Sequence, residues 1–177
     1  MAEEKKIGAI KEELQAAEDS MLPDFIARYE KDERSGVKSL VEKAGKRIQK
    51  LEAEYARIEN LKKYEKEYAD AGYICGIDEV GRGPLAGPVV AGAVILPKDC
   101  DILYINDSKK LSASMREKLY DESMEKAVAT GIGMAGPGRI DEINILQATY
   151  EAMRQAITNL KVKPDILLND EIGRAHV

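Results

Sequence analysis

The chain has 177 residues, of which 44% are hydrophobic and 33% are charged. That length is sufficient for one domain with a substantial core, plus an appendage. The formal net charge of -5 has the wrong sign for binding nucleic acid through bulk positive charge. Binding of a polyanion would therefore require basic residues concentrated on one face of the protein, or metal ions that offset the charge of its acidic residues.

The cysteines and the first residues indicate the compartment. Cys75 and Cys100 lack the spacing of metal ligands, and Cys75 lies in an apolar run, where a buried thiol is the usual interpretation. The start of the chain, Met1 followed by Ala-Glu-Glu-Lys-Lys, lacks the apolar core of a secretory signal. No apolar run reaches the ~18 residues of a membrane span. These features predict a soluble cytoplasmic protein without a membrane segment.

Charge density divides the chain. Charged residues occupy 32 of the first 70 positions but only 27 of the remaining 107. We therefore predict a helical extension over residues 1–70 and a second domain over residues 71–170, joined near Ala71 and Gly72.

The extension reads as three helices. Apolar residues recur every three or four positions from Ile7 to Met21, and Pro23 restarts the chain before a short helix through Tyr29. A long helix is predicted from Val37 to about Tyr68. Its apolar stripe is interpreted as packing on its own domain, with a coiled-coil partner as the alternative. Lysines on its outer face have two interpretations: they form ion pairs with glutamates one helical turn away, or they bind the phosphate backbone of a nucleic acid. These lysines are Lys38, Lys46, Lys50, Lys62, Lys63 and Lys66.

The second part opens with a predicted strand, Tyr73 to Ile77, which ends at Asp78 and Glu79. Gly81-Arg82-Gly83-Pro84 follows, and a second apolar run from Val89 to Leu96 predicts a returning strand. Side chains alternate along a regular strand, so the two carboxylates would point to opposite faces. The glycines after them can bend the chain, which would let both carboxylates reach one ion.

Further elements follow in order. Asn106 to Lys110 reads as a polar loop, and Ser112 is a candidate cap for a helix over residues 113–129. A strand is predicted over 130–135, a helix over 141–160, and a buried strand over 166–168 that leads into Asp170. Asp107 and Asp141 are interpreted as loop or helix-cap carboxylates.

Several segments in series resemble ribonuclease HII, the type 2 ribonuclease H. The principal one is G-I-D-E-V-G-R-G-P-L-A-G-P-V-V-A-G-A-V-I-L, from Gly76 to Leu96. The similarity continues through Asn106–Ser112, Arg116–Tyr120, Ile140–Ile145 and Pro164–Asp170. The resemblance implies a ribonuclease H-like α/β fold, a mixed sheet flanked by helices and incomplete at the C-terminus. Some bacterial members carry a helical extension ahead of the catalytic domain.

The resemblance also implies site residues. Asp78, Glu79 and Asp170 match three of the family's four catalytic metal-binding carboxylates. Gly81, Arg82 and Gly83 match the loop that reads a ribose 2′-hydroxyl, and Ser108, Lys109 and Lys110 match a segment that contacts the nucleic-acid backbone. Oxygen ligands select Mg²⁺ or Mn²⁺. No Ser-His or Cys-His arrangement in this sequence offers a competing mechanism.

The expected function is endonucleolytic cleavage of RNA in RNA–DNA hybrids, or of ribonucleotides embedded in duplex DNA. Family members act in DNA replication and repair, and their products carry a 5′-phosphate and a 3′-hydroxyl. The resemblance also implies that the complete protein is a monomer. A non-catalytic hybrid-binding fragment and a helical adaptor remain alternatives. Residues 171–177 do not continue the family pattern and are interpreted as a non-native tail. The resemblance implies that the family's fourth carboxylate falls beyond Asp170, so we expect little nuclease activity from the chain as written.

Overall fold

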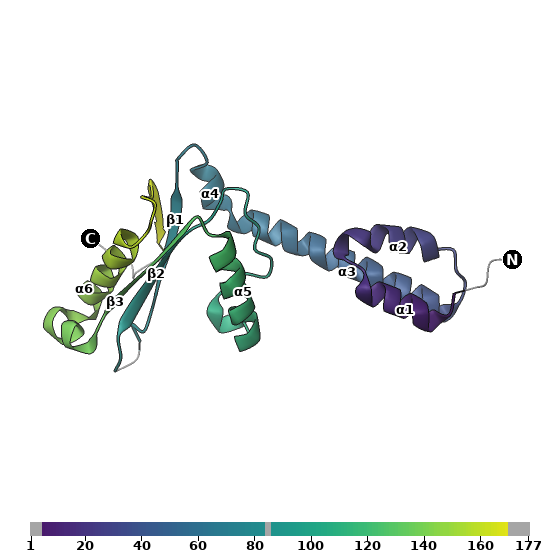
Figure 1. Ribbon diagram of the computed structural model, residues 1–177, viewed down its shortest axis with the longest axis horizontal. Coiled ribbons are helices and arrows are strands. Elements are labelled where there is room, and N and C mark those ends of the chain that lie inside the picture. Colours follow the sequence, from purple (N-terminus) through teal and green to yellow (C-terminus); the bar gives the residue numbers. More distant parts are fainter. Residues whose placement is uncertain (1–4, 84–85, 170–177) are drawn as a thin grey trace. The chain divides into compact units, whose positions relative to one another are not determined.

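The computed structural model describes residues 5–83 and 86–169 (Figure 1). The chain divides into two units between Asn60 and Leu61. The predicted boundary at residue 70 rests on charge density and stays a prediction. Within the described residues, no helix has the length and apolar character needed to cross a membrane.

The first unit is helical. Its helices are α1 (Ile7–Ala16), α2 (Leu22–Tyr29) and α3 (Ser35–Leu61), with a short 3-10 turn (Asp19–Met21) ahead of α2. Their inward faces meet in a core of mostly large apolar side chains, namely Ile10, Leu14, Leu22, Phe25, Val37, Leu40 and Ala44. The predicted stripe of the long helix therefore packs on its own unit over its first half, while Tyr55 further along is exposed.

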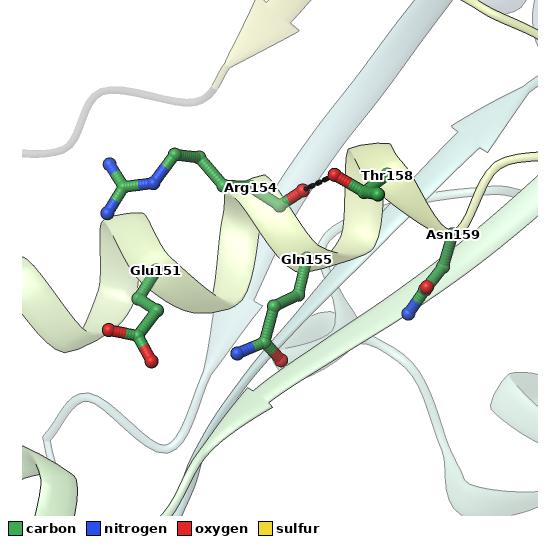
Figure 2. A pocket seen from close by; sticks show the side chains of 5 residues that line it. All are labelled: Glu151, Arg154, Gln155, Thr158 and Asn159. Atoms are coloured by element: carbon green, nitrogen blue, oxygen red, sulfur yellow. Dashed lines mark hydrogen bonds between the residues drawn. The ribbon is translucent and has the colours of Figure 1, made fainter.

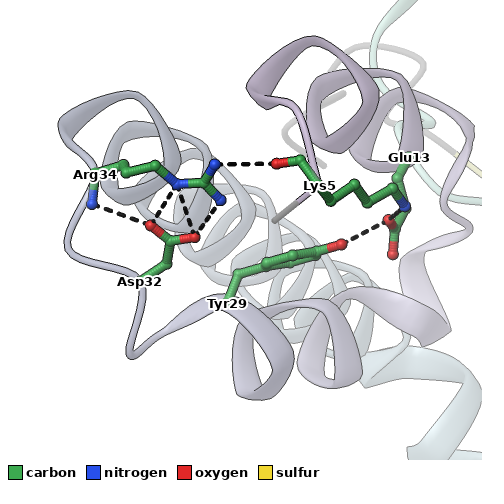
Figure 3. Close-up of polar contacts among 5 residues, drawn as sticks. All are labelled: Lys5, Glu13, Tyr29, Asp32 and Arg34. Atoms are coloured by element: carbon green, nitrogen blue, oxygen red, sulfur yellow. Dashed lines mark hydrogen bonds and ion pairs between the residues drawn. The ribbon is translucent and has the colours of Figure 1, made fainter. Parts of the chain in front are cut away.

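Polar contacts join the helix ends of this unit (Figure 3). Glu13 accepts a hydrogen bond from the Tyr29 hydroxyl at 2.9 Å and pairs with the Lys5 ammonium group. Arg34 binds both carboxylate oxygens of Asp32 and donates to the Lys5 carbonyl at 3.0 Å. The Lys5 ammonium group, and then the Tyr29 hydroxyl, lowers the pKa of Glu13. These contacts tie the turn before α3 to the start of α1.

Two helix boundaries differ from prediction. The first helix was expected to run to Met21, but α1 ends at Ala16 and Met21 is exposed. The long helix was expected to reach Tyr68, but it breaks at Lys62, which has ψ of 15°, before the short α4 (Lys63–Glu67). Lys62 forms an ion pair with Asp101, which follows the second strand. That contact is 39 residues away in sequence, so helical periodicity cannot reveal it.

The second unit contains a four-stranded mixed sheet. Its strands are β1 (Ile74–Val80), β2 (Val89–Ile95), β3 (Ala129–Ala135) and β4 (Ile166–Asn169), in the order β3-β2-β1-β4. The central strand β1 is antiparallel to β2 and parallel to β4. Its start is locked to that of β4, because Tyr73 N–H donates to the Asp165 carboxylate at 2.7 Å and Asp165 N–H donates to the Tyr73 carbonyl at 2.8 Å.

The helix α6 (Pro137–Thr158) covers one face of this sheet, packing on β2 and β3 (Figure 1). The core between them is built mainly from alanine and valine-sized side chains, with Ala91, Ala93, Ala148, Ala152 and Ala156 at its centre. Helix and strand backbones approach closely at β3. A Cβ atom on Gly133 would lie 2.0 Å from the Ala152 carbonyl oxygen, and one on Gly131 would lie 2.1 Å from that of Ala156. These two positions therefore require glycine.

The start of α6 lies earlier than predicted. Gly136-Pro137-Gly138 was expected to break the chain, yet Pro137 occupies the first turn of α6, where its missing N–H has no cost. The helix is kinked at Asn144, which has φ of 66°. The Asn144 side chain accepts from Gln147 N–H at 3.1 Å, so it caps the longer second segment. The predicted helix over 141–160 therefore corresponds mostly to this segment.

The other predicted helix and the strands of the second unit are confirmed with small shifts at their ends. Helix α5 (Ala113–Lys126) is capped by Ser112, whose hydroxyl accepts from Met115 N–H at 3.3 Å. The structure confirms the predicted fold class, which is a mixed sheet with flanking helices, preceded by a helical region.

Candidate functional site

The central strand β1 carries the two adjacent carboxylates. Asp78 lies opposite Gly92 of β2, and Glu79 lies opposite Ala91. Both are part of the strand, which was predicted to end at them and extends one residue further, to Val80. Hydrogen bonding to β2 continues through the pair Val80 and Val90, so the strand is regular at both carboxylates.

This regularity sends the two side chains to opposite faces of the sheet. Asp78 shares its face with Gly76 and is exposed, whereas Glu79 shares the face of the buried Cys75 and Ile77. A bend that would turn both carboxylates to one side was expected from the glycines. The structure has its turn only after Val80, so the Glu79 side chain lies on the covered side of the sheet.

The carboxylates already have polar neighbours. The Glu79 side chain is 15% exposed, and its Oε1 lies 3.5 Å from Nη1 of Arg82. Asp78 Oδ1 accepts a hydrogen bond from Glu79 N–H at 2.8 Å. The predicted loop arginine therefore lies directly against one of the predicted metal ligands, and the charge of Glu79 is partly balanced within the protein.

The glycines of the following turn have different roles. Gly81 has φ of 91°, and a Cβ atom there would lie 2.3 Å from the Pro88 carbonyl oxygen. Gly81 is thus required by the turn itself. A Cβ atom on Gly83 would meet no atom within 4 Å, so packing among the described residues does not explain a glycine at that position.

The third predicted ligand, Asp170, lies outside the described residues. The last residue of β4, Asn169, is paired with Ile77, the residue immediately before Asp78. Asp165 helps to fix this register through its contacts with Tyr73, and sequence analysis gave it no role. Among residues 5–83 and 86–169, no group of three or more His, Cys, Asp or Glu side chains is arranged to hold a metal ion.

The predicted backbone-binding residues lie on a separate short turn. Ser108, Lys109 and Lys110 form one turn of 3-10 helix and are exposed. Asp107 caps this turn by accepting from Lys109 N–H at 2.9 Å, which confirms its predicted capping role. Arg116 of α5 donates to the carbonyl oxygens of Ser108 and Leu111, at 3.1 and 2.8 Å. This support from Arg116 could not be predicted from the sequence, because its partners are backbone atoms.

Two shallow surface pockets lie elsewhere. One is formed on α6 by Glu151, Arg154, Gln155, Thr158 and Asn159 (Figure 2). The other is formed on α5 by Arg116, Glu117, Tyr120 and Asp121. Neither is lined by Asp78 or Glu79. The carboxylate pair therefore lies near the end of β1, outside both concavities.

Comparison with known proteins gives consistent matches over both units. A family model described as Ribonuclease HII matches residues 75–176, and one described as Ribonuclease HII N-terminal domain matches residues 6–69. A Lachnoclostridium phytofermentans protein named Ribonuclease HII is 60% identical over 167 residues, which cover 94% of this chain and 66% of that protein. An Enterococcus faecalis protein of the same name is 49% identical over 172 residues, covering 96% of this chain and 67% of that protein.

This chain thus spans about two thirds of the length of these two relatives. Among solved structures, the crystal structure of ribonuclease H2 from Pyrococcus horikoshii is 29% identical. That comparison has a TM-score of 0.45 and covers 56% of this chain and 50% of the other.

Proposed function

This chain belongs to the ribonuclease HII family, and from that membership we propose that the whole protein is a metal-dependent endoribonuclease. Its substrates are the RNA of RNA–DNA hybrids and ribonucleotides embedded in duplex DNA. Hydrolysis leaves a 5′-phosphate and a 3′-hydroxyl. The protein acts as a monomer in the bacterial cytoplasm, in DNA replication and repair. The extension over residues 1–70 and the catalytic part over 71–170 are its two domains.

The observation that carries this proposal is the position of the carboxylates in the sheet. Asp78 and Glu79 lie on the central strand directly before a turn that only glycine permits at Gly81. Strand β4 ends beside Ile77, and Asp170 follows β4 directly in sequence. We propose that Asp170 joins Asp78 and Glu79 as a ligand set.

The donor chemistry fits a hard divalent cation. Asp78 and Glu79 offer only carboxylate oxygens, the ligands that Mg²⁺ and Mn²⁺ prefer. Such ions, when bound, activate water and offset charge on the phosphodiester. In this proposal Asp78 contributes from the exposed face of β1 and Glu79 from the covered face, at the end of the strand.

The turn after β1 would select the sugar. Only the 2′-hydroxyl separates RNA from DNA at a given nucleotide, and backbone amides at glycine can approach it closely. We propose that the Gly83 backbone makes this approach, because no packing contact accounts for its missing side chain. Arg82 would bind a phosphate, for which its guanidinium fork is suited. Ser108, Lys109 and Lys110 would contact the backbone further along.

The test is an Asp78→Asn variant of the chain joined after Asp170 to a complete C-terminal part from a family member. The 177-residue chain is assayed beside it. The substrate is a DNA duplex that carries one ribonucleotide, with Mg²⁺ or Mn²⁺ present. Cleavage by the Asp78→Asn variant should be more than about 100-fold slower than cleavage by the completed wild-type chain. The reason is that even the loss of a residue that only supports a metal ligand typically lowers activity about 10- to 100-fold. Duplex binding should persist.

Two outcomes contradict the proposal. Cleavage that survives Asp78→Asn removes this carboxylate from the reaction. Binding without cleavage by the completed wild-type chain, in Mn²⁺ as well as Mg²⁺, would instead identify a non-catalytic hybrid-binding protein.

A second variant tests selection of the ribose. Gly83→Ala should reduce cleavage at the ribonucleotide with little change in thermal stability, because the added Cβ atom meets no protein atom within 4 Å. The matched control is Gly81→Ala, which should lower stability as well, since its Cβ atom would clash with the Pro88 carbonyl. Unchanged cleavage by the Gly83 variant would remove this glycine from recognition.

A further inference from the structure

Side chains from α6 and from Asn159, which caps its C-terminus, contact the free edge of β3. Strand β3 is at one end of the sheet order, so alternate residues direct their backbone polar groups away from β2. Met134 N–H donates to Oε1 of Gln155 at 3.1 Å, and Nδ2 of Asn159 donates to the Ile132 carbonyl at 2.8 Å. Figure 2 shows both side chains extending from α6 toward the strand. One donor and one acceptor of the edge are thus satisfied within the protein.

The close packing of α6 makes this possible. Gly131 and Gly133 have no side chains, so the α6 backbone lies against the β3 backbone. Gln155 and Asn159 are four residues apart and therefore lie on the same face of the helix. From that face they reach the edge at two alternate residues of the strand.

The edge lacks the usual protection against strand addition. Sheet edges are commonly blocked by charged residues, proline or bulges. The β3 sequence, Ala-Thr-Gly-Ile-Gly-Met-Ala, contains neither charge nor proline. Its residues Ile132 and Met134 are 62% and 56% exposed. Without the two α6 side chains, this strand would present free hydrogen-bonding groups beside exposed apolar side chains.

We propose that Gln155 and Asn159, the edge-closing pair, prevent β3 from pairing with β3 of a second copy of this chain. Two identical edge strands can pair in antiparallel fashion about a twofold axis, so each copy supplies the complementary edge that the other needs. The edge-closing pair offers internal partners for the same backbone groups. A second copy must displace both side chains before its strand can bind.

The first experiment removes both edge contacts in the full chain. Gln155→Leu combined with Asn159→Leu keeps side-chain size but deletes the acceptor and the donor. Sedimentation velocity over a concentration series should show a shift from the wild-type species toward a dimer of it. The matched control is Arg154→Leu combined with Thr158→Val. It removes two polar side chains that line the same pocket, and the Thr158 hydroxyl donates to the Arg154 carbonyl of its own helix.

The second experiment reads the edge directly through hydrogen exchange of the Met134 amide, at concentrations where the variant does not associate. Gln155→Leu should speed this exchange about fivefold, which corresponds to one hydrogen bond worth about 1 kcal/mol. Gln155→Glu should retain the wild-type rate, because a carboxylate also accepts.

Equal association of the control and the edge variant would overturn the proposal, because added apolar surface would then be the cause. So would a wild-type Met134 amide that exchanges as fast as that of the Gln155→Leu variant. If the wild-type chain already associates, protection of Met134 that increases with its concentration would show that β3 is paired between copies, and the proposal fails.

Discussion

The two units of this protein build their cores in opposite ways. The helical unit buries large side chains such as Leu22, Phe25 and Leu40. The sheet unit buries small ones, chiefly alanines, between α6 and strands that carry Gly131 and Gly133. Large side chains hold the helices apart and fill the space between them. Small side chains let a helix approach a sheet until their backbones nearly touch.

This difference predicts how each unit fails. A core of large side chains is damaged when volume is removed, because a cavity remains. A core of small side chains is damaged when volume is added, because the surrounding backbone must move. Substitutions that delete or add methyl groups therefore separate the two units.

The largest effect is expected from Phe25→Ala. Phe25 is 3% exposed, and its ring centroid lies 5.0 Å from that of Tyr29. Loss of a buried phenylalanine typically costs about 3–5 kcal/mol. Urea unfolding combined with hydrogen exchange should place this loss in the helical unit. Tyr55→Ala is the matched control, because Tyr55 is 45% exposed and should change stability little. An equal loss of protection in the sheet unit would show that the two cores unfold together.

A smaller but specific effect is expected from Gly133→Ala. Its Cβ atom would lie 2.0 Å from the Ala152 carbonyl oxygen, so α6 must shift away from β3 at a cost of about 1–3 kcal/mol. Gly92→Ala makes the same chemical change on the neighbouring strand, where no atom lies within 4 Å of the added group. That control should be neutral or stabilise by about 0.4–1 kcal/mol through the unfolded chain. Thermal unfolding of the two variants measures the difference. Equal stabilities would mean that the close approach is not required.

The smallest effect concerns the pH dependence of the helical unit. Hydrogen bonds from Lys5 and Tyr29 lower the pKa of Glu13 below its ordinary value of 4.5. A lowered folded-state pKa contributes stability at pH above the ordinary value, and this stability is lost as the pH falls through the folded-state value. Acidification below about pH 4.5 should therefore destabilise the unit.

Glu13→Gln should reduce the loss of stability at acidic pH, and it should lower the stability of the unit slightly at neutral pH. The same substitution at Glu12, an exposed carboxylate on α1, is the control. Urea midpoints between pH 3 and 7 (about the range in which carboxylates titrate) provide the measurement. If both variants keep the wild-type pH profile, Glu13 does not carry the dependence.

Local pattern was sufficient for most of the fold. The apolar spacing in residues 7–21 and 37–68 predicted helices, and the runs before Asp78 and after Gly87 predicted the first two strands. Capping chemistry at Ser112 and Asp107 was also readable, since a cap acts on an amide only two or three residues away. The motif from Gly76 to Leu96 identified the family without any structure. All these signals reside in short stretches of chain.

Tertiary structure decided what depends on contacts distant in sequence. The pairing of β1 with β2 keeps the strand regular through Val80 and so places Asp78 and Glu79 on opposite faces. The ion pair from Lys62 to Asp101 lies at the break in the long helix. Gly133 needs to be glycine only because Ala152 of α6 lies against it. Sequence patterns record which side chains alternate along a segment, but only packing determines which segment each side chain meets.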